Sequence, residues 1–427
     1  MKVLIVSHNS MSETSNMGKT LSSYFREFAP EELAQFYIHC EEPVDNTRCH
    51  NYYRFTDRDA LQSLFPFSEC GRIFRKEDIR ADRITARTDA GILGRVYQFG
   101  RKRTAWIYAL RNALWKCSRW DTKQFWNWVD DFAPDIVFFA SGDYGFLYDI
   151  ARRIAQHVGK PLVASCVDDF YLHNRNKNSI LGCILYRSFM KSVRKTIAYA
   201  EGIFTICPDM QKAYEELFEK KCYVLYTAAE EKQISLNPDA TGIAYLGNLG
   251  LKRNGQLVTM GRALQRIDVP GVSKFIDVYS GERNPQILKD LTPENGIRFH
   301  GAVSSEEVFR VMGSSMAVIH TESFDPEIQS RIRFSISTKI GETLMNGPCL
   351  IAYGPEGVAS IDYLKENGAA YTITERAQLE AGLREILTNA QLRGQIVTNA
   401  RKLANANHSM QINPAKVKAW LAEMCGE

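Results

Sequence analysis

Thr338, Lys339 and Glu342 have the residue types and the spacing of a face that binds a phosphorylated ribose. Residues three and four positions apart lie on the same side of a helix, so these three side chains would lie together. A carboxylate can accept hydrogen bonds from both hydroxyls of a ribose, and an ammonium group near a helix N-terminus attracts phosphate. The three residues therefore indicate nucleotide binding. A helix with a solvated Lys–Glu pair and no ligand is the alternative.

A helix is needed to hold these side chains, and the flanking residues predict one. Ser337 is a suitable N-cap, and we expect it at the nucleotide site. Gly347 followed by Pro348 is a stop signal. Ile340 and Leu344 form an apolar stripe that would pack against a sheet.

A second candidate for phosphate binding follows Ile243–Gly250, which predicts a strand that ends in a glycine-rich turn. Turn glycines let the backbone approach a ligand closely, and a basic pair after the turn supplies charge for a diphosphate. A helix is expected next, over residues 256–267. The residues assigned to this phosphate site are Gly247, Asn248, Lys252 and Arg253.

Four further β-rich runs alternate with helical stretches, at 275–281, 296–301, 317–322 and 349–354. Such alternation predicts a parallel sheet. Ligands bind beyond the carboxyl ends of the strands in open sheets of this kind. We therefore expect the ligand site at that edge of the sheet.

The order of these motifs resembles the donor-binding domain of retaining GT-B glycosyltransferases of the large family-4 group. The motifs are YLGNL, the basic pair, a strand that ends in Ser-Gly-Glu, RFHGAVSSEEV and STKIGETLMNGP. The resemblance implies an α/β fold with two Rossmann-like domains facing a cleft. It also implies transfer of a sugar from a nucleotide sugar to a glycan or lipid-linked acceptor, with retention of configuration, in the synthesis of a bacterial surface polysaccharide or glycoconjugate.

The resemblance also assigns roles to residues of the second half. Lys252 and Lys339 would act on the leaving diphosphate. The family's first Glu of a Glu-x7-Glu motif falls at Phe334, which cannot accept hydrogen bonds from a sugar. The nearest carboxylates, Glu322 and Asp325, are therefore assigned to the donor sugar. The remaining nucleotide-binding residues are Gly281, Ala302, Val303, Thr338 and Glu342.

The resemblance extends to the first half, where Lys2–Asn9 predicts a strand and Ser15–Phe28 a turn and a helix. In the family this turn holds a glycine that faces the donor diphosphate; Gly18 matches it, with Lys19 beside it. The Gly-Lys-Thr triplet does not form a nucleoside-triphosphatase loop, because Glu13 stands where that loop needs a glycine. No GxGxxG follows either first strand, which excludes a dinucleotide-binding fingerprint.

Val163–Tyr171 departs from the family's pattern at the end of a predicted strand. The family usually has a His-Asp pair there, whereas this chain has Asp168 and Asp169. These carboxylates could accept hydrogen bonds from sugar hydroxyls or take the acceptor's proton, and they are the expected catalytic residues of the first domain. A polar strand end without a catalytic role is the alternative.

The length of 427 residues predicts two domains, each able to bury its own core. We expect an acceptor-side domain over 1–228, with a basic and aromatic insertion at 53–125, and a nucleotide-sugar-binding domain over 240–408. In the family the last helix, here within 413–427, crosses back to the first domain.

The composition is that of a globular protein without an export signal or a membrane-spanning run. The ten cysteines show no CxxC pair and no Cys/His metal spacing. We therefore expect a cytoplasmic enzyme with reduced thiols. We also expect no metal, because Gly18, Lys252, Arg253 and helix N-termini could compensate the diphosphate, and no cofactor beyond the nucleotide sugar. His320 is interpreted as a structural histidine rather than a catalytic one.

Charge is concentrated in the segment 72–123, which has fourteen Lys and Arg against five Asp and Glu, a balance of 14 − 5 = +9. Aromatic residues alternate with these basic residues. This pattern favours contact with an anionic membrane surface, on the inner face of the cell membrane. A solvated insertion with core aromatics is the alternative. Nucleic acid is not an expected partner, because no recognised binding motif accompanies the charge.

Two other classes of function remain open at this point. A sugar-nucleotide epimerase can share the fold and would act on a nucleotide sugar without an acceptor. A degenerate module that serves as a scaffold would bind no nucleoside diphosphate. Phe334 and Asp168 favour the scaffold, whereas Lys252, Lys339 and Glu342 favour an enzyme.

Overall fold

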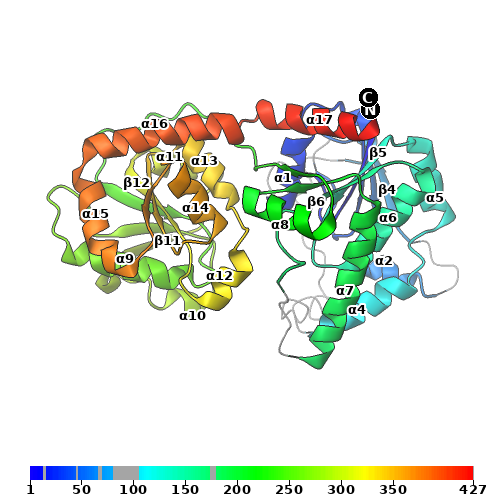
Figure 1. Cartoon of the computed structure of the whole chain (residues 1–427), viewed down its shortest axis with the longest axis horizontal. Helices are drawn as coiled ribbons and strands as arrows, with labels where there is room; N and C mark the ends of the chain where they lie inside the picture. Colours follow the sequence, from blue (N-terminus) through cyan, green and yellow to red (C-terminus); the bar gives the residue numbers. More distant parts are fainter. Residues whose placement is uncertain (13–15, 45–46, 66–69, 80–104, 174–178, 427) are drawn as a thin grey trace. The chain divides into compact units, whose positions relative to one another are not determined.

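The computed structural model describes the chain except for residues 13–15, 45–46, 66–69, 80–104, 174–178 and 427. The chain divides into two compact units, Met1–Leu225 with Asn413–Glu427, and Tyr226–Ile412. We refer to them as unit 1 and unit 2. Each contains one parallel or largely parallel sheet with helices on its faces (Figure 1). This confirms the predicted α/β fold with two Rossmann-like domains.

The sheet of unit 1 has the order β4-β3-β2-β1-β5-β6-β7-β8 within the described residues. Every neighbouring pair is parallel except β3 and β4. Its central strands are buried from end to end, as expected when helices cover both faces. The strands are β1 (Val3–Ser7), β2 (Leu33–Tyr37), β3 (Asn51–Arg54), β4 (Arg72–Arg75), β5 (Ile136–Ala140), β6 (Leu162–Ser165), β7 (Gly202–Thr205) and β8 (Cys222–Val224).

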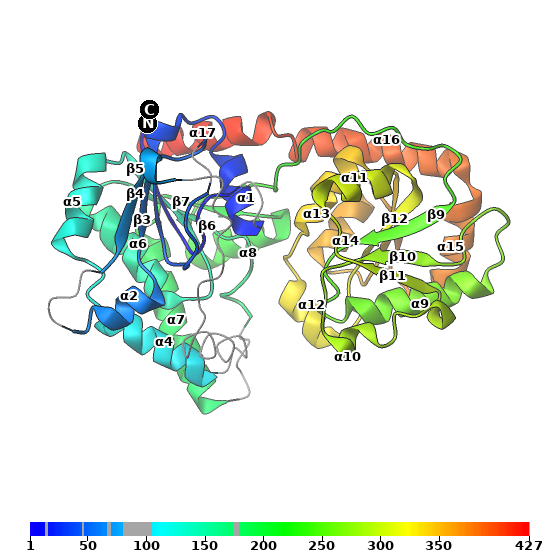
Figure 2. The same ribbon diagram turned by 180° about the vertical axis from the view of Figure 1, so that it is seen from behind.

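The helices of unit 1 include the last helix of the chain, α17, which lies beside α1 in both ribbon views (Figures 1 and 2). Val417 and Leu421, one helical turn apart, are fully buried in the same cluster as Val3 and Ile5 of β1. The helices are α1 (Asn16–Tyr24), α2 (Asp57–Gln62), α4 (Ala105–Cys117), α5 (Lys123–Phe132), α6 (Gly145–Val158), α7 (Ile180–Tyr199), α8 (Pro208–Phe218) and α17 (Ile412–Cys425).

Several aromatic residues of the basic segment 72–123 belong to the core of unit 1. Phe74, Trp115 and Trp120 are 1%, 2% and 4% exposed. Trp115 stacks on Phe146 of α6 with a centroid separation of 4.5 Å. These side chains therefore pack inside the unit and do not face a membrane. Seven of the segment's basic residues lie within 80–104, outside the described residues.

The sheet of unit 2 is fully parallel, with the order β11-β10-β9-β12-β13-β14 within the described residues. Its strands are β9 (Gly242–Leu246), β10 (Ile276–Tyr279), β11 (Ile297–Gly301), β12 (Ser315–Thr321), β13 (Cys349–Tyr353) and β14 (Tyr371–Ile373). Its helices are α9 (Arg253–Arg266), α10 (Pro285–Leu288), α11 (Ser305–Gly313), α12 (Pro326–Ile332), α13 (Thr338–Asn346), α14 (Ala359–Glu366), α15 (Leu379–Thr388) and α16 (Ala390–Asn407).

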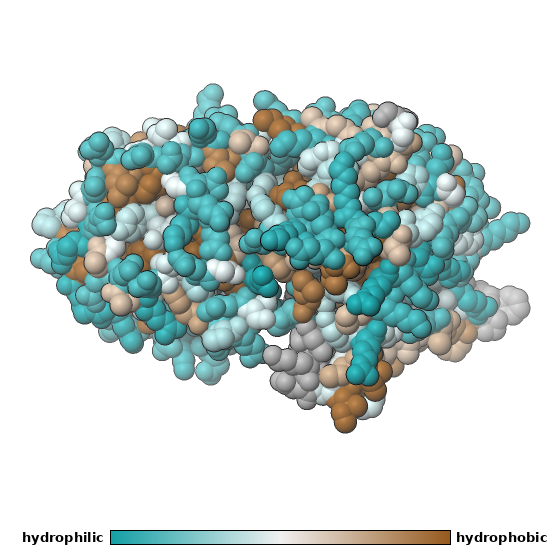
Figure 3. Space-filling model, viewed as in Figure 1, coloured by the Kyte–Doolittle hydropathy of each residue, from teal (hydrophilic) through white to brown (hydrophobic). Residues whose placement is uncertain are grey.

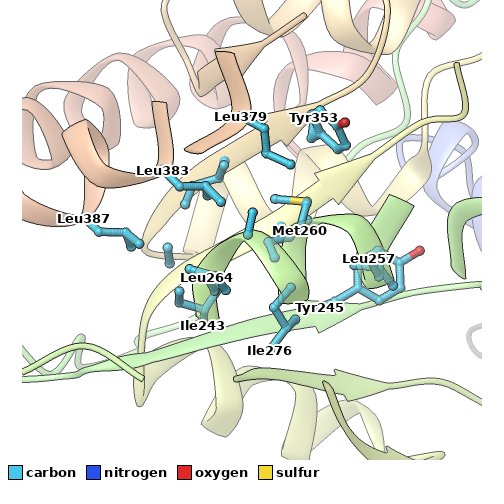
Figure 4. Packing of buried hydrophobic residues seen from close by; sticks show 14 of the residues in the cluster. Ile243, Tyr245, Leu257, Met260, Leu264, Ile276, Tyr353, Leu379, Leu383 and Leu387 are labelled. Atoms are coloured by element: carbon cyan, nitrogen blue, oxygen red, sulfur yellow. The ribbon is translucent and has the colours of Figure 1, made fainter. Parts of the chain in front are cut away.

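Packing of α9 fixes the turn that precedes it. Leu257, Met260 and Leu264, at positions i, i+3 and i+7, are buried and pack toward Leu383 of α15 and Ile243 of β9 (Figure 4). The helix begins at Arg253, three residues earlier than predicted, because the apolar stripe begins only at Leu257 and gives no signal for the first turn.

His408 follows α16 and is held by two hydrogen bonds inside unit 2. Its Nδ1 lies 2.8 Å from the carbonyl oxygen of Thr227, and its Nε2 lies 3.0 Å from the hydroxyl of Tyr363. A carbonyl can only accept, so Nδ1 carries the proton and Nε2 accepts from Tyr363. The ring is 1% exposed, and burial lowers the pKa of His408 to about 4.

We expect His408 to make folding sensitive to acid. A histidine whose pKa is lowered by folding stabilises the native state above its unfolded pKa of about 6.5, and this contribution is lost as the pH falls toward 4. For His408 the loss between pH 7 and pH 5 is about 2 kcal/mol. Urea unfolding of the wild type and of His408→Gln at both pH values measures it.

The control for this measurement is His157→Gln, which changes an exposed histidine of α6. His8 and His320 also have a pKa lowered to about 4 by burial, so the comparison with wild type isolates the share of His408. An equal loss of stability between pH 7 and pH 5 in wild type and His408→Gln would contradict the assignment.

Candidate functional site

The strand order places a topological switch point in each unit. In unit 2 the chain runs from β9 outward to β11 and then returns to β12, so the carboxyl ends of β9 and β12 flank the point of reversal. In unit 1 the same relation holds for β1 and β5. Open α/β sheets bind ligands beyond the strand ends at such points. The residues predicted for nucleotide and sugar binding in unit 2 follow the carboxyl ends of its strands or lie on α13.

The turn after β9 is held by its own polar groups. The hydroxyl of Tyr245 donates to the carbonyl of Asn248 at 2.6 Å, and the side-chain oxygen of Asn248 accepts from the amide of Gly250 at 2.6 Å. The next two residues, Leu251 and Lys252, have φ values of 59° and 60°. Left-handed backbone at two successive non-glycine residues is strained, and such strain often marks a functional site.

This turn presents Arg253 to Glu322, the first residue after β12. The guanidinium group donates from Nε to Oε2 at 3.0 Å and from Nη2 to Oε1 at 2.8 Å. The two side chains are 16% and 3% exposed, so the pair is largely removed from water. A bidentate pair of this kind fixes both geometry and charge across the switch point.

His320 lies beside the buried pair on β12. Its Nε2 is 3.6 Å from Oε1 of Glu322 and 3.2 Å from the hydroxyl of Ser360. Burial lowers the pKa of His320 to about 4, although the nearby Glu322 carboxylate acts in the opposite direction. His320 is therefore neutral at physiological pH and packs as a structural strand-end residue.

Lys252 and Asp325 form a second ion pair across the same switch point, with Nζ 2.6 Å from Oδ2. The lysine side chain is 64% exposed, and the hydrogen bond with Asp325 raises the pKa of Lys252. The other oxygen of Asp325 accepts from the amides of Glu327 and Ile328 at the start of α12. This pair is open to solvent, unlike the Arg253–Glu322 pair.

The face predicted for α13 is present. Thr338 and Lys339 are exposed and Glu342 is partly exposed, whereas Ile340 and Leu344 are 2% and 0% exposed. The helix ends at Asn346 with Gly347 as its C-cap, as predicted.

Ser337 occupies the N-cap position of α13, as predicted, although its side chain makes no capping hydrogen bond among the described residues. Phe334 is 3% exposed, with the guanidinium of Arg333 4.9 Å from its ring centroid. Its ring is part of the packing of unit 2 and is not presented to a ligand.

Two further predicted loops of unit 2 lie close together. A Cβ added to Gly281, after β10, would lie 3.9 Å from the Cβ of Ala302, after β11. Val303 follows Ala302, and both residues have accessible surface. Gly281 and Ala302 contribute backbone and a small side chain at this edge, and Glu282 and Arg283 of the first loop add charged side chains.

Gly18 in unit 1 packs tightly against its own chain. A Cβ at this position would lie 2.5 Å from the carbonyl oxygen of Ser10 and 2.9 Å from the amide nitrogen of Ser12. Only glycine therefore fits between α1 and the turn after β1. Lys19, the next residue, is exposed.

Asp168 and Asp169 differ in their surroundings after β6. Asp169 is 8% exposed, and its Oδ1 accepts from the amides of Tyr171 and Leu172 and from the hydroxyl of Tyr214, at 2.9 to 3.0 Å. This carboxylate holds the turn. Asp168 is half-buried and is the more accessible of the two.

A cluster at the β1–β5 switch point of unit 1 was missed from the sequence. The ring of His8 stacks on Tyr144 at a centroid separation of 6.0 Å, and the guanidinium of Arg111 lies 4.0 Å from the centroid of Tyr144. Burial and the charge of Arg111 lower the pKa of His8 to about 4. The signal was available for His8, which lies at the end of the first predicted strand, but not for Arg111 or Tyr144.

A buried polar residue of β2 was also missed. Gln35, fully buried, donates to the hydroxyl of Ser7 at 2.8 Å and to the carbonyl of Asn9 at 2.9 Å, and accepts from the amide of Met11 at 2.9 Å. Its hydrogen bonds fix the turn after β1, and Gly18 of α1 packs against this turn. A glutamine inside an apolar strand was the only sequence signal.

Comparison with known proteins supports the fold. No protein-family model and no curated protein sequence matches the chain. Among solved structures, HepE from Anabaena in complex with UDP is 12% identical and covers 99% of this chain and 100% of that chain, with a TM-score of 0.63. Sucrose-phosphate synthase from Thermosynechococcus elongatus is 9% identical, covers 99% of each chain and has a TM-score of 0.63.

WaaG, described as a glycosyltransferase involved in lipopolysaccharide biosynthesis, is 9% identical, covers 98% of this chain and 99% of that chain, and has a TM-score of 0.55. At these identities the likeness shows the fold alone. The chain has the two-domain fold known as GT-B, which confirms that part of the prediction.

The buried Arg253–Glu322 pair yields a stability prediction. Arg253→Met should lower the free energy of unfolding by about 3–5 kcal/mol, because it leaves the Glu322 carboxylate buried without its cation. Arg253→Met combined with Glu322→Leu should recover most of that loss, because it removes both buried charges. Urea unfolding followed by far-UV circular dichroism measures both effects, because unit 2 contains no tryptophan.

Arg266→Met is the matched control, because Arg266 and Glu380 form an exposed pair in the same unit, with side chains 58% and 48% exposed. Exposed pairs contribute little, so this variant should unfold like the wild type. A single Arg253→Met variant as stable as the control would show that Glu322 does not depend on the pair.

Proposed function

We propose that this chain is a glycosyltransferase that moves a sugar from a nucleotide-sugar donor to a glycan or lipid-linked acceptor with retention of configuration. One observation carries the proposal. Two ion pairs, Arg253–Glu322 and Lys252–Asp325, lie at the switch point of unit 2, and the chain continues from them into α13, which has a polar face. The structures similar to this chain include HepE with bound UDP and a glycosyltransferase of lipopolysaccharide synthesis. The proposed pathway is the synthesis of a bacterial surface polysaccharide or glycoconjugate.

The proposed donor site binds the ribose through hydrogen bonds and the diphosphate through positive charge. Glu342 accepts from the ribose hydroxyls, and Lys252 and Lys339 bind the diphosphate. Both lysines are exposed, so they can turn toward a ligand at little cost in desolvation. Arg253 is engaged by both oxygens of Glu322, and we propose that it positions the turn rather than changing partner.

The proposed catalysis relies on positioning and on charge that develops at the leaving group. As the bond from the sugar to the diphosphate breaks, negative charge grows on the diphosphate, and nearby ammonium groups stabilise it. Asp325 is the proposed carboxylate for the donor sugar, because its side chain is 30% exposed whereas that of Glu322 is 3% exposed. Asp168 is the proposed acceptor-side carboxylate, because Asp169 is occupied by the turn.

We propose that transfer needs no metal. Among the described residues no group of three or more His, Cys, Asp or Glu side chains has the arrangement of a metal site. The exposed lysines and the N-terminus of α13 would neutralise the diphosphate in place of a metal cation.

We further propose a cytoplasmic location with peripheral attachment to an anionic membrane through 72–123, and no nucleic-acid partner. None of the helices in the described part of the chain is long and apolar enough to cross a bilayer.

A ligand panel with the purified full chain tests the proposal. UDP and UDP-sugars are the first probes, because UDP is bound in the HepE structure. A true ligand at 100 times its dissociation constant should stabilise the protein by about 2.7 kcal/mol, seen as a raised Tm. Turnover with acceptor should persist in EDTA, and the anomeric configuration of the product, read by NMR, should match the donor.

The other outcomes of the panel decide between the rival functions. Conversion of a nucleotide sugar in the absence of acceptor would establish an epimerase or hydrolase. Failure of every nucleoside diphosphate to raise Tm would establish a binding or scaffold module. Loss of all turnover in EDTA, restored by a divalent cation, would overturn metal independence.

Glu342→Gln tests the nucleotide site itself. We expect it to weaken nucleotide affinity by about 1.5–3 kcal/mol, because it replaces a charged acceptor of the ribose hydroxyls, without changing Tm in the absence of ligand. Glu366→Gln on α14, an exposed glutamate of the same unit, is the control and should bind like wild type. Isothermal titration of both variants with UDP makes the comparison; equal affinities would exclude Glu342 from the ribose site.

A further inference from the structure

The most exposed large apolar side chains among the described residues gather on two helices of unit 1. Ile180 of α7 is 84% exposed, and Trp106 and Leu110 of α4 are 77% and 74% exposed. Ile184, one turn after Ile180, is 57% exposed. The two helices lie side by side in both ribbon views, and hydrophobic surface covers the outer end of α7 (Figures 1, 2 and 3). Exposed apolar groups of this density usually mark an interaction site.

A basic stripe continues from the apolar end of α7. The exposed positions 180, 184, 187, 191 and 195 are three or four residues apart, so they follow one side of the helix. Two isoleucines come first, and Arg187, Lys191 and Lys195 come next. Neither α7 nor α4 contains an acidic residue. The surface is therefore apolar at its outer end and positively charged behind it.

The dimensions of this stripe fit a bilayer surface. At a rise of about 1.5 Å per residue, Ile180 and Ile184 span about 6 Å, and Arg187 lies about 4.5 Å further along the axis. When Ile180 and Ile184 enter the bilayer end-on, Arg187 therefore lies just outside the buried apolar groups, where a lipid phosphate can pair with it. Lys191 and Lys195 follow at about 6 and 12 Å from Arg187, so Lys191 lies within the Debye length of about 8 Å and Lys195 lies beyond it.

The positive charge of the stripe indicates which partner this surface can bind. A second copy of the chain in a two-fold arrangement would bring this basic surface against itself, which is unfavourable. An anionic lipid surface complements it, and each basic residue close to such a surface adds to binding. We infer that the outer part of α7, with the start of α4, docks on an anionic lipid bilayer. This inference rests on the membrane attachment proposed for 72–123 and extends it to α7; it does not depend on the proposed glycosyl transfer.

Vesicle flotation of the full chain without any donor tests the inference. The probes are vesicles of phosphatidylcholine with phosphatidylglycerol and vesicles of phosphatidylcholine alone. Wild type should bind the anionic vesicles more strongly. Ile180→Glu combined with Ile184→Glu should lower the partition coefficient by about tenfold or more, because the apolar insertion is lost. Arg187→Gln should lower it by about fivefold on anionic vesicles, and Lys195→Gln by less.

The matched controls lie on α8 of the same unit. Leu217→Glu changes an apolar side chain that is 37% exposed, and Lys212→Gln changes an exposed lysine. Both should bind like wild type. Nucleotide binding should be unchanged in all variants, which separates this test from that of the glycosyl transfer.

Three results would overturn the inference. The first is binding of the Ile180→Glu, Ile184→Glu variant equal to that of Leu217→Glu. The second is a lowered Tm in the double variant without a change in vesicle binding, which would show that the chain itself covers this surface. The third is a dimer in solution that the double variant abolishes while wild type binds no vesicles, which would identify a second copy as the occupant.

Discussion

The bidentate ion pair between Arg253 and Glu322 is the constraint on which the unit 2 site depends. Arg253 is the first residue of α9, where a positive charge opposes the helix dipole, and the Glu322 carboxylate compensates for it. Bringing the guanidinium to Glu322 requires the left-handed conformations of Leu251 and Lys252, at about 1–2 kcal/mol each. Packing of α9 against the sheet holds this strained turn in place, and the turn in turn directs Lys252 into solvent.

Unit 1 fixes the equivalent turn with both neutral and charged groups. The turn after β1 is fixed by the buried Gln35 and by Glu41, which accepts from the amide of Ser10 and the side chain of Asn9. No close ion pair spans β1 and β5 among the described residues of this edge; a stacked His8 and Tyr144 with Arg111 above them take that place. The two switch points therefore differ: a buried bidentate ion pair links the strand ends in unit 2, whereas stacked rings with a nearby guanidinium lie there in unit 1.

Periodicity and stop signals predicted the strands β9 to β13 of unit 2 and the faces of α13, because these depend on local patterns of burial. The two-domain fold was predicted from the length and the order of the motifs. The partners of the polar residues could not be predicted, because they are set by packing between distant segments. Glu322 is 69 residues from Arg253, and only the fold shows that its carboxylate is already paired. Asp169 was expected to act on a sugar, yet Tyr214 and the following turn occupy one of its oxygens. Spacing alone also could not separate the buried Trp115 from the exposed Trp106.

In the proposed function, the two ion pairs at the unit 2 switch point would respond differently to an incoming diphosphate. Lys252 and Arg253 are each neutralised by a carboxylate. A diphosphate is therefore bound electrostatically only if one of these ion pairs opens or another cation, such as Lys339, takes part. Opening Arg253–Glu322 would leave a carboxylate buried without a partner, which is costly. Opening Lys252–Asp325 costs little, because exposed pairs are weak and the lysine is solvated. A diphosphate that takes Lys252 therefore frees one oxygen of Asp325 for a sugar hydroxyl, while Arg253 and Glu322 stay in place as the frame. In the proposed function, donor binding itself would thus make the sugar-recognising carboxylate available.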